Sequence, residues 1–126
     1  MESGPKVLLV EDEPMLSELL TEALTDKGFA VHAAPDAMRA LEHLLSGADI
    51  DIMLTDIDLG EGMDGAQLAR IARELRPALP VIYASGRRSM GDFRSVPGST
   101  FLPKPYTLNQ IDATIARHLH KDRPAA

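Results

Sequence analysis

The chain has 126 residues, of which 44% are hydrophobic and 25% charged, the composition of a globular protein with one core. It has no cysteine, which excludes disulfides and zinc–thiolate sites, and its formal net charge of −6 argues against nucleic-acid binding. No apolar run reaches the ~20 residues of a membrane span, and no signal peptide is evident, so we expect a cytoplasmic location. We expect a single domain over residues 1–126, with its core at 5–120 and a frayed tail at 121–126.

Two periodicities alternate along the chain. Short continuous apolar runs predict five strands that are buried on both faces. These runs are Lys6–Val10, Phe29–Ala33, Ile50–Thr55, Pro80–Ala84 and Thr100–Leu102. Apolar residues at helical spacing predict a helix after each strand, and the fourth helix is short, with little periodicity. The predicted helices are Pro14–Lys27, Asp36–Leu45, Ala66–Arg76, Arg87–Val96 and Leu108–Leu119.

Alternating strands and helices are typical of the α/β class, and they predict a doubly wound parallel sheet that is covered on both faces. In an open sheet of this kind, ligands bind outside the carboxyl ends of the strands. Polar residues follow four of the predicted strands, and we expect them to meet at that edge of the sheet. These residues are Glu11, Asp12, Asp56, Ser85 and Lys104.

The carboxylates of Glu11, Asp12 and Asp56 would converge at this edge. Two like charges about 4 Å apart repel by several kcal/mol at an effective dielectric near 20, so the cluster must bind a proton or a cation. Oxygen ligands without His or Cys favour Mg²⁺, Mn²⁺ or Ca²⁺. The Lys104 ammonium and the Ser85 hydroxyl suit phosphate oxygens. Since no Walker A motif is present, Asp56 itself can act as the nucleophile at a metal-assisted phosphoryl site.

Five short motifs occur in a fixed order at these strand ends. They are VLLVEDE at 7–13, LTD at 54–56, DG at 64–65, YASG at 83–86 and FLPKPY at 101–106. Over about residues 5–120 the chain resembles the receiver domain of response regulators in two-component signalling, of the stand-alone, chemotaxis-regulator-like kind. The resemblance implies a flavodoxin-like fold, with strand order 2-1-3-4-5 and five helices.

The resemblance also implies a role for each acidic residue of the motifs. Asp56 would accept a phosphoryl group from the phosphohistidine of a partner. Glu11, Asp12 and Asp56 would hold Mg²⁺, together with the backbone carbonyl of Asp58. Taken alone, Asp12 beside Pro14 would more often be a helix cap, a role that is compatible with metal binding.

Three further residues would respond to the phosphoryl group in this family. Ser85 and Lys104 would each bind one of its oxygens, and the bond between Lys104 and Pro105 would be cis. Phe101 would be the switch aromatic, which swings inward when Ser85 is drawn to the phosphate. Phe101 lacks the hydroxyl of the tyrosine that is commoner in the family, which argues against an output that needs a buried hydroxyl.

The chain departs from the family pattern in the loop beyond Asp56. Gly60 stands where a proline is usual, and the pair Asp64-Gly65 comes one residue later than usual, so residues 60–63 carry an insertion. This loop borders the site, and we expect it to affect partner fit or the lifetime of the phosphoryl group.

The partners that the resemblance implies are a histidine kinase or histidine phosphotransfer protein and a downstream protein target. The chain would be a monomer or weak dimer without a nucleic-acid or membrane partner, and it would catalyse only its own phosphorylation and dephosphorylation. Three alternatives stay open: a phosphorylation-independent interaction module, a flavodoxin-like ligand binder, and a receiver cut from a hybrid histidine kinase.

Other side chains receive structural readings. The four histidines show no metal-binding spacing, and His118 and the others are read as surface residues. Met15 and Leu16 begin the first helix beside the site, and we expect one to lie in the core and the other to contribute to a docking patch.

Overall fold

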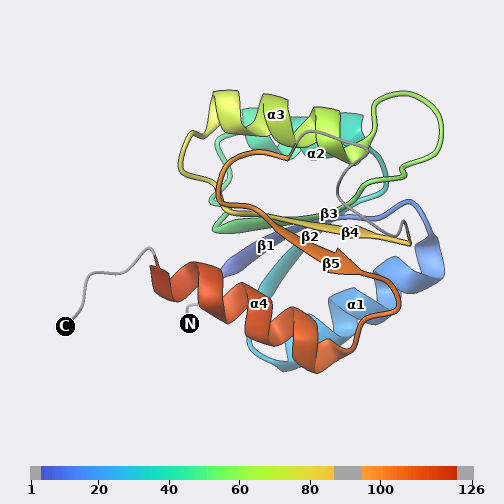
Figure 1. The fold of residues 1–126 in the computed structure, drawn as a ribbon, viewed down its shortest axis with the longest axis vertical. Helices are drawn as coiled ribbons and strands as arrows, with labels where there is room; N and C mark the ends of the chain where they lie inside the picture. The colour runs from blue at the N-terminus through green and yellow to red at the C-terminus, as the bar shows by residue number, and fades with distance from the viewer. Residues whose placement is uncertain (1–3, 87–94, 122–126) are drawn as a thin grey trace.

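The computed structural model describes residues 4–86 and 95–121, and a five-stranded sheet forms its centre (Figure 1). All neighbouring strands are parallel, and they lie in the order β2-β1-β3-β4-β5. The strands are β1 (Lys6–Val10), β2 (Ala30–Ala34), β3 (Ile52–Asp56), β4 (Val81–Ser85) and β5 (Thr100–Pro103). The predicted α/β class, parallel sheet and strand order are therefore confirmed.

Helices cover both faces of the sheet. They are α1 (Pro14–Asp26), α2 (Ala37–Leu45), α3 (Gly65–Leu75) and α4 (Leu108–Lys121). Figure 1 shows α1 and α4 on one face and α2 and α3 on the other. The described residues contain four helices where five were predicted, and most of the fifth prediction, Arg87–Val96, lies outside the described residues. Within the described ranges, no helix has the length and apolar character needed to cross a bilayer.

The core consists of two layers that the sheet separates. Successive side chains of a strand point to opposite faces, so a continuously apolar strand supplies both layers. Leu8 and Met53 pack with residues of α2 and α3 on one side. Leu9 and Leu54 pack with residues of α1 and α4 on the other. This double burial explains why the strands appear in the sequence as unbroken apolar runs.

The third strand lies slightly later in the chain than its apolar run predicts. It begins at Ile52, and just before it the Asp51 carboxylate accepts a hydrogen bond from the Lys6 backbone N–H at 2.7 Å. It ends at Asp56, which is paired in register with Ala84 of β4. Asp56 is thus the last residue of the strand, and the ladder holds its backbone.

The reading of His118 as a surface residue is wrong. The residue is only 7% exposed, and its Nε2 lies 2.7 Å from the Thr100 hydroxyl oxygen of β5. His118 follows Ile111 and Ile115 on the buried face of α4, at helical spacings of four and three residues. The contact with Thr100 offsets the cost of burying this polar ring, because a buried polar group needs a hydrogen bond.

Candidate functional site

The carboxyl ends of the strands bring the predicted polar residues to one edge of the sheet. Glu11 directly follows β1, and Asp56 and Ser85 are the last residues of β3 and β4. Lys104 directly follows β5, and its backbone N–H donates to the Ser85 carbonyl at 2.8 Å. This edge is where open parallel sheets bind ligands. The expected convergence of the set therefore occurs.

Three carboxylates form a compact acidic cluster at this edge. Glu11, Asp12 and Asp56 each contribute an oxygen, and these oxygens all lie within 4.8 Å of one another. Glu11 is 4% exposed and Asp56 is 8% exposed, whereas Asp12 is open to solvent. At about 5 Å two unit charges repel by roughly 3 kcal/mol at an effective dielectric of 20. Three hard oxygen donors at this spacing suit a divalent cation such as Mg²⁺.

Lys104 supplies the positive charge that faces the cluster. Its Nζ donates to Asp56 Oδ2 at 2.9 Å and lies 3.7 Å from Glu11 Oε1. Burial alone lowers the pKa of Lys104, but the hydrogen bond to Asp56 and the charges of Asp56 and Glu11 outweigh it and raise the pKa. The ammonium therefore stays charged at neutral pH. Among the described residues, one lysine against three carboxylates leaves the cluster with an excess of negative charge.

The two buried carboxyls titrate above their ordinary range. Desolvation raises the pKa of Asp56, although the hydrogen bond from Lys104 and the charge of Lys104 oppose the shift. Desolvation also raises the pKa of Glu11, against a hydrogen bond from the Glu13 backbone N–H at 3.1 Å. A raised carboxyl pKa means that the folded protein disfavours the ionised form. A bound cation would remove that disadvantage.

The backbone around Asp56 is held from two sides. The Thr55 hydroxyl donates to the Asp56 carbonyl at 2.9 Å. The Gly65 backbone N–H donates to the Ile57 carbonyl at 2.8 Å, which places the start of α3 directly against the strand end. A Cβ on Gly65 would lie only 2.0 Å from the Asp56 carbonyl oxygen. Only glycine permits this approach, so Gly65 supports the position of Asp56.

A capping box fixes the helix that begins at Gly65. The Asp64 carboxylate accepts from the Gln67 backbone N–H at 2.8 Å, and the Gln67 side chain accepts from the Asp64 backbone N–H at 3.0 Å. In the loop of residues 60–63, Gly60 and Gly62 have φ angles of +78° and +89°, which L-residues rarely adopt. Sequence reasoning used Asp64-Gly65 only as a motif and missed the structural role of Gly65.

The remaining predicted residues border the cluster at different depths. Ser85 is fully buried, and Asp58 is exposed, with its charge acting on Asp56. Phe101 is half-buried on β5, pairs in register with Tyr83 and packs against the α2–α3 side of the core. The Lys104–Pro105 bond is cis, as the family resemblance implied.

At the start of α1, Met15 is 76% exposed, whereas Leu16 is partly buried and packs against the α1–α4 side of the core. Leu16 therefore packs against the core, as was expected of one of the two, and the role of the other in a docking patch stays a prediction.

Comparison with solved structures supports a common fold. A response regulator receiver protein from Sinorhizobium medicae WSM419 superposes with a TM-score of 0.86 at 38% identity, over 92% of this chain and 94% of that one. The receiver domain from the hybrid histidine kinase CckA superposes with a TM-score of 0.78 at 30% identity, over 90% of this chain and 98% of that one. Both proteins are receivers that the chain spans almost completely.

Curated relatives include longer proteins of two kinds. The sensor kinase CckA of Brucella abortus is 36% identical over 91% of this chain, which spans 12% of that protein. The transcriptional regulatory protein TctD of Salmonella typhimurium is 32% identical over 92% of this chain, which spans 52% of that protein. Residues 7–116 match the response regulator receiver domain family. The chain belongs to this family of two-component signalling domains.

Proposed function

We propose that Asp56 accepts a phosphoryl group from a phosphohistidine donor, and that the chain signals through the protein surface that changes as a result. The observation that carries the proposal is the contact of the buried Asp56 carboxylate with Lys104 at 2.9 Å, beside the carboxylates of Glu11 and Asp12. The acidic cluster and the ammonium together match the charges of a metal-bound phosphoryl group. Membership of the receiver family supports the same reading.

The proposed reaction is an in-line displacement at phosphorus. A carboxylate oxygen of Asp56 forms a P–O bond while the P–N bond of the donor phosphohistidine breaks, and the imidazole keeps the electron pair. In the proposed dephosphorylation, which ends the signal, water attacks the acyl phosphate, restores the Asp56 carboxylate and releases inorganic phosphate. The chain thus acts as a reactant in its own modification and not on a separate small substrate.

Mg²⁺ fits the donor set of this chain. Glu11, Asp12 and Asp56 would hold it through carboxylate oxygens, and the backbone carbonyl of Asp58 is proposed as a further ligand. When bound, the ion would neutralise the charge of the incoming phosphoryl oxygens. Lys104 would pair with one of these oxygens after leaving Asp56 Oδ2.

Ser85 and Phe101 are proposed to convert phosphorylation into a conformational change. Ser85 is the last residue of β4 and Phe101 lies on the neighbouring strand, opposite Tyr83. A phosphoryl oxygen would recruit the Ser85 hydroxyl, and the half-buried Phe101 ring would repack toward the core. Such a switch shifts the populations of two conformers and does not create a new one.

The phosphodonor is proposed to dock on an apolar patch of α1 and α4. Leu16, Leu19, Tyr106 and Leu108 line a groove of about 340 Å³ there, and Leu19 and Leu108 are 63% and 44% exposed. Helix α1 begins two residues after Asp12, so a helix of the donor seated in this groove would bring its phosphohistidine to the site. A histidine kinase or histidine phosphotransfer protein in the cytoplasm fits this role, with a protein as the downstream target.

Beryllofluoride with Mg²⁺ tests the proposal, since it mimics an acyl phosphate on an aspartate. Amide spectra of the wild type should shift around Asp56, Ser85 and Phe101, and Asp56→Asn should abolish the shifts. Asp49→Asn is the matched control, because Asp49 is an exposed acid that precedes β3 at the opposite end of the sheet. Equal shifts in Asp56→Asn would refute the assignment, and unchanged partner binding in that variant would favour a phosphorylation-independent module.

A further inference from the structure

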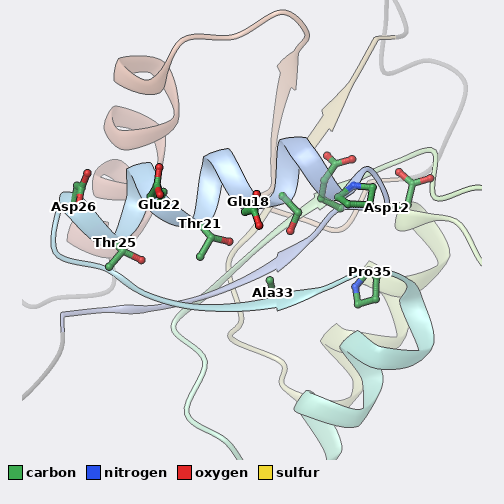
Figure 2. Close-up of a pocket in the computed structure, with 11 residues that line it drawn as sticks. Asp12, Glu18, Thr21, Glu22, Thr25, Asp26, Ala33 and Pro35 are labelled. Carbon is green, nitrogen blue, oxygen red and sulfur yellow. The ribbon is translucent and has the colours of Figure 1, made fainter.

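A second groove, of about 600 Å³, lies between α1 and the edge strand β2 (Figure 2). It begins beside Glu11 and Asp12 and continues along α1 to Asp26. Figure 2 shows Thr21 and Thr25 on the side of α1 that faces β2. Its lining is separate from the apolar patch assigned to the phosphodonor except at Glu22 and Asp26, which line both grooves.

The groove exists because small side chains face each other across it. Ser17, Thr21 and Thr25 recur every four residues and form one stripe along α1. Ala33 opposes them from β2 and is exposed. Larger apolar residues at these positions would have packed the helix onto the strand, as Leu20 and Leu24 do deeper in the core. Beside β2, at the edge of the sheet, a groove therefore remains between the strand and α1.

At the sheet edge beside this groove, one side of the β2 backbone pairs with no other described strand. The Ala30 N–H donates to the Pro5 carbonyl, and the Ala34 carbonyl accepts from the Glu11 N–H, so both residues face β1. In a parallel ladder successive residues point their backbone groups to alternate sides, so Val31 and Ala33 point theirs away from β1. β2 is the first strand of the sheet order, and no described strand pairs with this side. A strand edge of this kind is a template for an added strand.

The charge of the groove selects the kind of chain that could be added. Glu18, Glu22 and Asp26 form a second stripe on α1, and the described residues that line the groove include acids but no Lys or Arg. Lys27, which follows them, has its Nζ 3.8 Å from Asp112 of α4 and is thus directed to the other side of the helix. A segment that adds to β2 would gain from basic side chains that reach these carboxylates.

We propose that an extended, Lys- or Arg-rich segment of a partner protein binds in this groove as a sixth strand on β2. Its backbone would pair with Val31 and Ala33, and its basic side chains would lie along Glu18, Glu22 and Asp26. The 13-residue helix α1 is about 20 Å long at 1.5 Å per residue, which matches about six residues of extended chain. This interaction goes beyond the proposed phosphoryl transfer, because it requires neither Asp56 nor a bound ion.

A capped octapeptide of alternating lysine and threonine is the probe, and binding is measured without Mg²⁺ or a phosphodonor. Failure therefore leaves the proposed function untouched. We expect saturable binding by titration, with amide shifts and slowed amide exchange at Val31 and Ala33. The double substitution Glu18→Gln with Glu22→Gln should weaken binding at least fivefold. Glu61→Gln with Glu74→Gln removes the same charge from exposed residues outside the groove and should leave affinity within twofold.

Ala33→Pro tests the strand edge separately from the charge. Proline is tolerated at an edge where its missing N–H faces solvent, and it would remove one donor from the docking edge. Binding should fall at least tenfold in this variant while its far-UV circular dichroism is retained. If the variant unfolds, the strand pairing is tested instead by amide exchange at Val31 and Ala33 of the wild type with the peptide bound. Unprotected amides, unaltered binding by folded Ala33→Pro, an equal loss in the Glu61/Glu74 control, or no binding of the probe would each overturn the proposal.

Discussion

Replacement of Gly65 by alanine should destabilise the protein by pushing α3 away from the site. The new Cβ would lie 2.0 Å from the Asp56 carbonyl oxygen and 3.0 Å from Ile57 Cα, whereas ordinary contacts are 3.4–4 Å. The first turn of α3 must then move by more than 1 Å, which disrupts the 2.8 Å bond from the Gly65 N–H to the Ile57 carbonyl. Overpacking costs about 1–3 kcal/mol and the lost hydrogen bond about 1 kcal/mol. The better helix propensity of alanine returns up to about 1 kcal/mol, which leaves a net loss of about 2 kcal/mol.

Thermal unfolding without Mg²⁺ measures this loss directly. For a domain of this size, 1 kcal/mol corresponds to roughly 3–5 °C, so Gly65→Ala should lower Tm by roughly 6–10 °C. The same displacement should move the Asp56 carboxylate, so the Mg²⁺ concentration that gives half-maximal stabilisation should also rise. Urea unfolding at 25 °C provides an independent value for the free energy of unfolding.

Gly86→Ala is the matched control, because Gly86 also adjoins a predicted site residue but a Cβ there would meet no atom of the described residues within 4 Å. This control should change the free energy of unfolding by less than about 0.5 kcal/mol. A Gly65→Ala variant as stable as the wild type would refute the reasoning, since the close approach would then not constrain the chain. An equal loss in Gly86→Ala would point to a general intolerance of alanine near the site.

Three further outcomes follow from the site and the core. Mg²⁺ at 100 times its Kd should stabilise the wild type by about 2.7 kcal/mol, and Asp12→Asn should need at least tenfold more Mg²⁺ for the same rise in Tm. Burial raises the pKa of Asp56, so its ionisation lowers stability as pH rises through that pKa. Without Mg²⁺, Asp56→Asn should therefore be more stable than the wild type at pH 7.5, and the difference in stability should shrink toward pH 4. A variant less stable than the wild type at pH 7.5 would contradict the raised pKa of Asp56. His118→Ala should cost about 1–3 kcal/mol, and a double-mutant cycle with Thr100→Val should show coupling of about 1 kcal/mol, whereas strict additivity would mean that the 2.7 Å contact contributes nothing.

The sheet and its acidic edge were predictable because each rests on a local pattern. Strands that are buried on both faces must be continuously apolar, so β1 and β4 stand out in the sequence. The strand ends then determine which polar residues meet, and Glu11, Asp56 and Lys104 meet as expected.

Other features depend on contacts between distant segments and leave weaker patterns. In the sequence, Gly65 looks like an ordinary loop glycine. What requires glycine there is the carbonyl of Asp56, nine residues earlier, which only the folded chain brings close to it. His118 was misjudged because its polarity was weighed above its position, although the spacing from Ile111 and Ile115 places it on the apolar face. The groove beside β2 was also missed, since the small polar residues that form it on α1 resemble any solvated helix surface.

The position of Asp56 inside the β3 ladder limits how a conformational change could be transmitted from the site. The main chain around the proposed acceptor is held on both sides. Asp56 pairs in register with Ala84, the Ile57 N–H donates to the Ala84 carbonyl, and the start of α3 adjoins the strand end. Phosphorylation of Asp56 would therefore have little scope to displace the backbone of β3. The charge added to the proposed acceptor would therefore act mainly on neighbouring side chains that can change conformation. On this view, the proposed signal would pass across the sheet through β4 and β5 and not along β3.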